Sequence, residues 1–192
     1  MPLLQSTDAL AECPRRVLIA GTSGSGKTTL AALVAQVLGI PHIEIDALFH
    51  GPDWSPRQSF EADVRQFSNI PGWVTEWQYS VVRAVLAERA DLLVWLDLSR
   101  STVMYQVIRR TLRRRLHREV LWNGNVEAPL KSIFTDRQHI VRWAWTTHGK
   151  TALRVATLRE QRPELPIIRL TSRSAARHWL DGPLRQARCS TA

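Results

Sequence analysis

An eight-residue, glycine-rich segment places the strongest constraint on this chain of 192 residues. Residues 21–28 read Gly-Thr-Ser-Gly-Ser-Gly-Lys-Thr and match the pattern G-x-x-x-x-G-K-[ST] in full. The motif follows a continuous apolar run at 17–20, typical of a strand buried on both faces, and it precedes strong helix formers that end at Gly39. This order predicts a strand, a tight loop and a helix.

The composition of this loop suits phosphate binding. Glycine dihedrals let successive backbone N–H groups point into one concavity, and the helix N-terminus adds a partial positive charge. Lys27 would reach the β- and γ-phosphates of a nucleoside triphosphate, and the Thr28 hydroxyl would bind Mg²⁺. The predicted nucleotide-binding set is Gly21, Thr22, Ser23, Gly24, Ser25, Gly26, Lys27, Thr28 and Thr29.

Strands and helices are expected to alternate along the remaining chain, which predicts a three-layer α/β fold with a parallel sheet. Further strands are expected at 42–45, 73–75, 92–96 and 167–170. Helices are expected at about 57–67, 80–89, 100–118, 130–145, 149–161 and 174–180. We divide the chain into a leader (1–14), one domain (15–184) and a tail (185–192).

Arginine dominates the charge of the chain. There are 26 basic and 17 acidic residues, and only three of the basic ones are lysines. Seven arginines lie between residues 100 and 118, where no acidic residue occurs. Because the guanidinium fork matches phosphate oxygens, this stretch favours a phosphate-bearing partner. A GC-rich coding sequence is the alternative source of the arginine bias.

The cysteines and the hydropathy indicate the compartment. Cys13 and Cys189 stand near opposite ends, which is the spacing of neither a disulfide framework nor a metal-ligand cluster. No apolar run approaches the roughly 18 residues that a membrane span needs. We therefore expect a cytoplasmic protein without a membrane partner.

Seven features together resemble a known family: the phosphate loop, HIEIDAL (42–48), GPDW (51–54), GWVxxxxYS (72–80), an apolar strand ending at Asp97, the arginine-rich helix and WNGNxE (122–127). They are similar to small P-loop proteins described as DNA topology modulation or adenylate-kinase-like ATPases. These proteins are related to nucleoside-monophosphate, shikimate and gluconate kinases. The resemblance covers about residues 16–181. It implies a five-stranded parallel sheet in kinase-type order and a mobile lid over about residues 100–130.

Three carboxylates follow predicted strands, and the resemblance implies roles for the first two. Asp46 would accept a proton from an acceptor hydroxyl or orient a Mg²⁺-bound water, with loop capping as the alternative. Glu76 would belong to the metal shell, although the family shows Asp-Gly-Asn-Tyr where this chain has Glu76-Trp77-Gln78-Tyr79. Trp77 in place of glycine puts acceptor binding in question. Asp97 has the sequence context of a Walker-B carboxylate, with helix capping as the alternative.

The arginine-rich helix supports two interpretations. By resemblance, Arg110, Arg114 and Arg118 would be lid arginines that stabilise the transferring phosphoryl group. Helical spacing predicts an apolar face made of Met104, Ile108, Leu112 and Leu116, with Arg109, Arg110, Arg113 and Arg114 mainly opposite. The same arginines could neutralise a nucleic-acid backbone. The six histidines show no metal-ligand spacing and are expected to be structural or exposed.

These observations lead to one hypothesis and two alternatives. The leading hypothesis is an ATP- and Mg²⁺-dependent kinase that passes the γ-phosphoryl group to a nucleotide or another small-molecule acceptor. The first alternative is an NTPase or NTP-dependent nucleic-acid-binding protein. The second, suggested by Trp77, is a nucleotide-binding regulatory module without transferase activity.

Overall fold

A five-stranded parallel sheet forms the centre of the computed structural model, which describes residues 3–117 and 145–187, without the side chains of 114–117. The strands are β1 (Leu3–Leu4), β2 (Arg16–Gly21), β3 (Trp73–Glu76), β4 (Leu92–Leu96) and β5 (Ile167–Leu170), in the order β1-β5-β4-β2-β3. In this order the strand before the phosphate loop lies between β3 and β4. The predicted five-stranded parallel sheet is confirmed.

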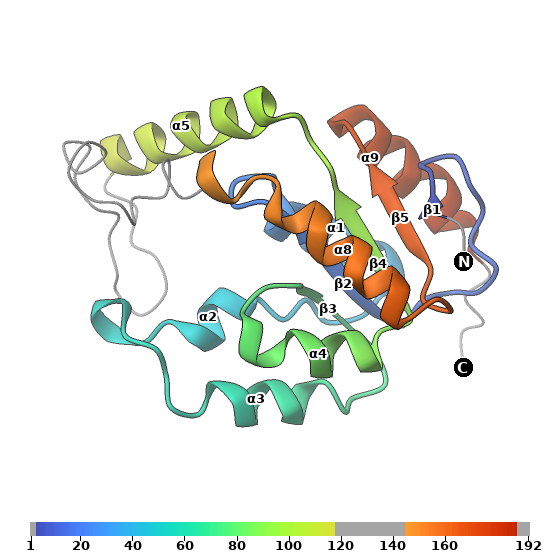
Figure 1. The fold of residues 1–192 in the computed structure, drawn as a ribbon, viewed down its shortest axis with the longest axis horizontal. Helices are drawn as coiled ribbons and strands as arrows, with labels where there is room; N and C mark the ends of the chain where they lie inside the picture. Colours follow the sequence, from blue (N-terminus) through green and yellow to red (C-terminus); the bar gives the residue numbers. More distant parts are fainter. Residues whose placement is uncertain (1–2, 118–144, 188–192) are drawn as a thin grey trace.

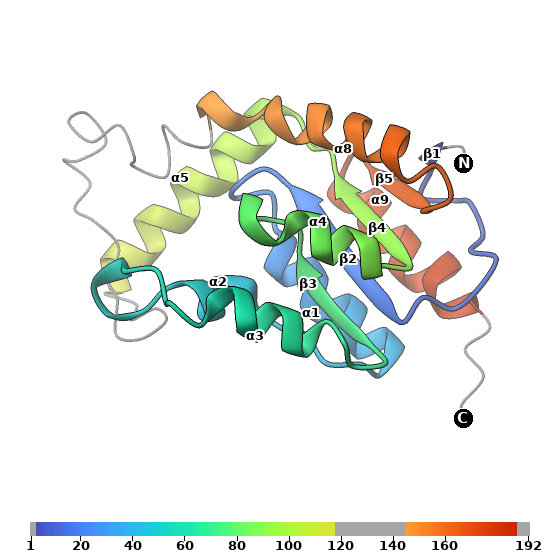
Figure 2. The same ribbon diagram turned by 60° about the horizontal axis from the view of Figure 1, so that its bottom comes forward.

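Helices cover both faces of the sheet (Figures 1 and 2). One face carries α1 (Lys27–Leu38), α9 (Arg173–Trp179) and the single-turn segment η3 (Leu180–Leu184). The other carries α3 (Phe60–Phe67), α4 (Ser80–Arg89) and α8 (Lys150–Gln161). The described part of the chain contains no helix long and apolar enough to cross a membrane.

Strand β2 contributes to both cores. Val17 and Ile19 pack into the core beneath α1, whereas Leu18 and Ala20 pack into the core beneath α4. This division explains the continuous apolar run, since a strand covered on both faces has no solvent side. The carboxyl end of β2 opens into the phosphate loop, and Figure 1 shows α5 (Arg100–His117) passing over this edge of the sheet.

The strand predicted at 42–45 is wrong. His42 makes one isolated parallel bridge to Val74, after which the chain enters the short helix α2 (Ile45–Phe49). Side chains of β3 bind the backbone that a strand would use in a ladder: Thr75 Oγ1 donates to the Ile43 carbonyl (2.7 Å), and Glu76 accepts from the Ile45 N–H (3.2 Å). Asp46 therefore lies in the first turn of α2 and not at a strand end.

The fifth strand is instead β1. Leu3 and Leu4 pair with Ile167 and Ile168 at the opposite edge of the sheet, within the segment predicted as a leader. The division into leader, domain and tail stays a prediction.

Cys13 is disulfide-bonded, which the cysteine spacing did not predict. The other cysteine, Cys189, lies outside the described residues. The N-terminal segment lies beside α9, where the Ser6 carbonyl oxygen is 3.4 Å from His178 Nδ1. The cytoplasmic setting stays a prediction.

Candidate active site

The phosphate loop turns sharply between β2 and α1. Gly24 and Gly26 have φ angles of +81° and +96°, in the left-handed region where a side chain is strained. The Ser25 N–H donates to the Thr22 carbonyl (3.0 Å), and the first turn of α1 closes with Leu30 N–H on Gly26 (2.9 Å). The predicted strand–loop–helix unit has this geometry.

A buried hydroxyl in this loop lacks a protein partner. Ser25 is buried, and its Oγ has no hydrogen bond among the described residues. Buried polar atoms are normally satisfied, so an orphan hydroxyl in a glycine-rich loop that opens a helix indicates a missing polar ligand. A phosphate oxygen supplies the acceptor that the hydroxyl lacks. The described loop therefore fits a nucleotide phosphate.

Lys27 lies at the first position of α1 and is only 9% exposed. Its ammonium donates to the Thr22 carbonyl (3.2 Å). Burial lowers the pKa of the Lys27 ammonium. The charges of Asp46 and Glu76 oppose this shift, whereas the charge of Arg110 adds to it. Three other predicted site residues, Asp46, Glu76 and Arg110, are thus close enough to Lys27 to influence its charge.

Glu76 ends β3 and is 1% exposed. Its Oε2 accepts from the Ile45 N–H, and its Oε1 lies 3.3 Å from His42 Nε2. Burial alone would raise the pKa of Glu76, but hydrogen bonds from His42, Ile45 and the Thr28 side chain together hold it below its ordinary value. Thr28 and Glu76, the two residues predicted to hold Mg²⁺, are thus close enough for Thr28 to lower the pKa of Glu76.

Asp46 faces the segment that follows β3. Its Oδ1 accepts from Gln78 Nε2 (2.8 Å) and from the Tyr79 hydroxyl (2.6 Å). The same hydroxyl lies 3.2 Å from His50 Nε2. The sequence analysis assigned no role to Gln78 and Tyr79, and it expected His42 and His50 to be structural or exposed. The available signal was their position in the chain: Gln78 and Tyr79 follow Glu76, and the two histidines flank Asp46.

Helix α5 buries a face that differs from the predicted one. Val103, Val107 and Thr111 are buried, whereas Ile108 is 45% exposed and Leu112 is exposed as well. The cause is the contact with the phosphate loop, where Val107 packs against Gly24. Of the predicted apolar face, Ile108 and Leu112 are therefore exposed, whereas Met104 packs against the buried residues Val103 and Val107.

Arg110 lies at the margin of the buried face of α5. This position places it near Lys27, while Arg109 and Arg113 are exposed. The Arg114 side chain and Arg118 lie outside the described residues. Their lid role, like the role of Arg110, stays a prediction.

Asp97, the third carboxylate, is already paired. Its Oδ2 accepts from Arg169 Nε (2.8 Å) and Nη2 (2.5 Å). The Thr28 side chain instead acts on Glu76, whose pKa it lowers.

Trp54 of GPDW and Trp77, which follows β3, differ in packing. Trp77 is half-buried, and its indole N–H donates to the Arg83 carbonyl (3.1 Å). Trp54 sits edge-on to His50, with ring centroids 5.1 Å apart, and keeps 37% of its surface exposed. Packing and this hydrogen bond account for Trp77, whereas Trp54 is the more exposed of the two.

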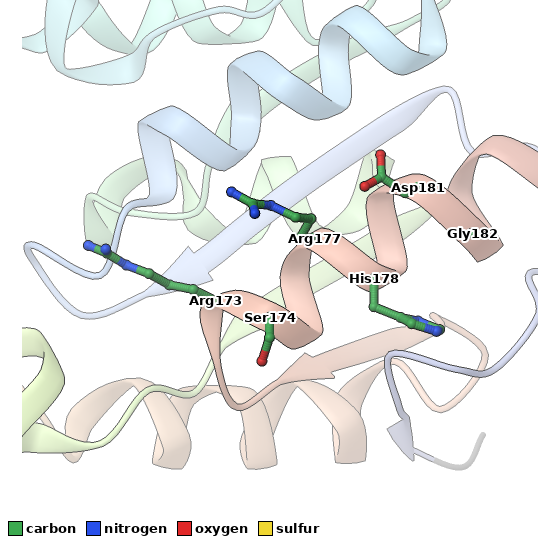
Figure 3. Close-up of a pocket in the computed structure, with 6 residues that line it drawn as sticks. All are labelled: Arg173, Ser174, Arg177, His178, Asp181 and Gly182. Carbon is green, nitrogen blue, oxygen red and sulfur yellow. The ribbon is translucent and has the colours of Figure 1, made fainter.

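Gln106 connects the loop to α9. With its amide nitrogen toward the loop it donates to the Gly24 carbonyl (2.9 Å), and its oxygen accepts from Arg173 Nε (3.3 Å). Arg173 also borders a hollow on α9 that Arg177 and Asp181 line (Figure 3). Figure 3 shows Arg173 and Arg177 pointing away from one side of α9, with Ser174 and His178 on the other. The residues that line this hollow are not those that act on the pKa of Lys27.

Comparison with known proteins identifies the fold. No protein-family model matches the chain. No curated protein matches it either. A solved gluconokinase from Sinorhizobium meliloti 1021 has a TM-score of 0.53 and 21% identity over 92% of this chain and 95% of that one. Shikimate kinase from Acinetobacter baumannii, solved with shikimate, has a TM-score of 0.53 and 15% identity over 88% and 90%. The chain has the fold of the P-loop kinases, and the resemblance is confirmed at that level.

Proposed function

We propose that this chain is a kinase that transfers the γ-phosphoryl group of ATP to a small-molecule or nucleotide acceptor in the presence of Mg²⁺. One observation carries the proposal: the buried Lys27 opens α1 directly after the glycine-rich loop, where Asp46, Glu76 and Arg110 act on its pKa. Phosphoryl transfer depends mainly on positioning and charge stabilisation, and these residues supply both signs of charge near Lys27.

The residues present fit MgATP. The loop amides, Ser25 Oγ and Lys27 would hold the phosphates, and Thr28 with Glu76 would hold Mg²⁺. Bound Mg²⁺ would neutralise charge on the phosphate oxygens. The low pKa of Glu76 keeps its carboxylate ionised at neutral pH, as a metal shell requires.

The other side chains have defined tasks in this proposal. An acceptor oxygen attacks the γ-phosphorus, the bond to the β–γ bridging oxygen breaks, and ADP leaves. Asp46 takes the acceptor proton, while Lys27 and Arg110 stabilise the charge that develops on the transferring group. Arg114 and Arg118 would close over the phosphates and exclude water.

A second candidate function rests on the outer side of α5. Arg109 and Arg113 are exposed there, as a surface that contacts a nucleic-acid backbone requires. The protein would then be an NTPase whose turnover responds to nucleic acid. Duplex affinity should fall steeply with salt and should weaken when Arg109 and Arg113 are replaced by Ala. Affinity that survives both replacements contradicts this candidate.

An acceptor screen tests the kinase proposal. ADP release from MgATP is measured with nucleosides, nucleoside monophosphates, D-gluconate, shikimate and other sugars and sugar acids. We expect one acceptor class to raise ADP release, and Lys27→Ala or chelation of Mg²⁺ to abolish the increase. Arg109→Ala is the matched control, since Arg109 is exposed. If no acceptor raises ADP release above the basal rate, the kinase proposal fails and the regulatory-module alternative gains.

A further inference from the structure

We infer that Tyr79 is a positioning residue that holds Asp46 by one oxygen and leaves the other oxygen for the acceptor hydroxyl. The inference rests on the proposed function, because it assigns Asp46 to the acceptor. It adds a residue that the sequence patterns did not single out for a role.

The hydrogen bonds of Asp46 are divided unequally between its oxygens. Both side-chain donors, Gln78 Nε2 (2.8 Å) and the Tyr79 hydroxyl (2.6 Å), bind Oδ1. Within the described part of the chain, no hydrogen bond reaches Oδ2. A carboxylate held by two donors on one oxygen has a fixed orientation, and its second oxygen can accept from a ligand.

The Tyr79 ring is itself held in place. It stacks on Phe49 with centroids 4.0 Å apart and an interplanar angle of 22°, and it meets Phe60 edge-on at 5.3 Å. Its backbone has φ +56°, which is uncommon for a residue with a side chain. A strained residue persists only where its surroundings over-determine it, and such residues gather at functional sites.

The number of hydrogens on the Tyr79 hydroxyl determines which group donates in each hydrogen bond of this network. The Tyr79 hydroxyl has one hydrogen, which it gives to Asp46, so it accepts from His50 Nε2. Burial raises the pKa of Tyr79, and the charge of Asp46 raises it further. The phenol therefore stays protonated at neutral pH and remains a donor to the carboxylate.

Removal of the hydroxyl alone separates positioning from packing. Tyr79→Phe keeps the ring against Phe49 and Phe60 but deletes the donor to Asp46. We expect kcat with the acceptor found in the screen to fall by about tenfold, with the KM for ATP unchanged. Tyr105→Phe is the matched control, since Tyr105 is the only other tyrosine and is 64% exposed on α5. Basal ATP hydrolysis, in which water replaces the acceptor, should fall in the same variant.

A spectroscopic measurement tests the contact directly. In Tyr105→Phe protein labelled with 3-fluorotyrosine, a single ¹⁹F resonance reports Tyr79. Asp46→Asn should shift this resonance, whereas Asp97→Asn should leave it in place. An unchanged resonance in Asp46→Asn overturns the contact and the inference with it.

The kinetic outcomes are distinguishable. Unchanged kcat in Tyr79→Phe overturns the role of Tyr79 and leaves the kinase proposal intact. A lower KM for the acceptor with undiminished kcat also overturns the inference, because Tyr79 would then compete with the acceptor for Asp46. A wild-type protein that turns over no ATP under any condition overturns both proposals.

Discussion

Gly24 of the phosphate loop lies directly against Val107 of α5: a Cβ added to Gly24 would stand 2.1 Å from Val107 Cγ2. This contact joins the helix that carries Arg110 to the loop that would hold the nucleotide. It also explains why Val107 is buried and Ile108 is exposed, because the side of α5 that carries Val107 faces the loop.

Gly24→Ala should therefore damage the loop in two ways. It forces a side chain into φ +81° and against Val107, and we expect a loss of about 2–4 kcal/mol in the free energy of unfolding. Affinity for ATP should fall as the loop shifts. Urea unfolding and calorimetric ATP titration measure the two effects.

Gly39→Ala is the matched control for that experiment. Gly39 also has positive φ, +64°, but an added Cβ meets nothing within 4 Å. We expect a cost of about 1 kcal/mol and unchanged ATP affinity. Equal effects of the two substitutions would show that the contact with Val107 contributes nothing.

Lys27→Met should abolish ATP-dependent stabilisation without lowering the stability of the ligand-free protein. Burial lowers the pKa of Lys27 from 10.5. Below the lowered pKa the buried side chain is charged, and that charge reduces the free energy of unfolding. Between that pKa and 10.5 the unfolded chain binds more protons, and the free energy of unfolding of the wild type should rise with pH. The variant should lack this rise, whereas Lys150→Met, at an exposed site, should keep it. Thermal unfolding from pH 7 to 10, with and without MgATP, measures both effects.

Glu76→Gln should lower both the stability of the fold and the apparent affinity for Mg²⁺. The pKa of Glu76 lies below 4.5, so its contribution to stability is complete above pH 4.5 and is lost as the pH falls through the lowered pKa. At pH 7 we expect a loss of about 1–3 kcal/mol, because charge-assisted hydrogen bonds from His42 and Ile45 become neutral ones.

Two measurements check the Glu76 substitution. Urea unfolding at pH 7 and pH 4 should show a smaller pH dependence in Glu76→Gln than in the wild type. The Mg²⁺ concentration for half-maximal ATP turnover should rise in the variant. Glu88→Gln, on the exposed side of α4, should change neither quantity. A variant with wild-type Mg²⁺ dependence would remove Glu76 from the metal shell.

The central unit of the fold was predictable because its signals are local. The motif at 21–28 specifies a tight loop between a strand and a helix, and the run 17–20 is apolar throughout because both faces of β2 are covered. Arg110 was chosen from the resemblance, and the structure places it near Lys27.

The sequence-based predictions fail where contacts with residues distant in the chain determine the local structure. Residues 42–45 have the composition of a strand, but Thr75 and Glu76 bind their backbone and the chain turns into α2. Helical spacing on α5 offers two apolar stripes, and only the packing of Val107 on Gly24 selects between them. The network of Asp46 with Tyr79 and His50 likewise forms only after α2 is placed beside the end of β3.

Asp97→Asn should affect stability and spare catalysis. Asp97 forms an ion pair with Arg169 in which the side chains keep 23% and 39% of their surface exposed. Partly exposed pairs contribute little, so we expect a loss of about 1 kcal/mol. ATP turnover should stay at the wild-type level, whereas Asp46→Asn should lose about 100-fold or more in kcat. A large loss of turnover in Asp97→Asn would mean that Asp97, and not Glu76, holds the metal.

Arg110→Ala and Arg109→Ala compare two neighbours on opposite sides of the boundary between buried and exposed faces of α5. Arg110 acts on the pKa of Lys27, and Arg109 is exposed. If Arg110 stabilises the transferring phosphoryl group, its loss should lower kcat by about 100-fold while ATP affinity changes little. Arg109→Ala should leave kcat unchanged and, under the nucleic-acid alternative, should weaken duplex binding and its salt dependence. The reverse pattern, with turnover lost only in Arg109→Ala, would mean that the outer face of α5, and not Lys27 with the charges that act on it, controls ATP turnover.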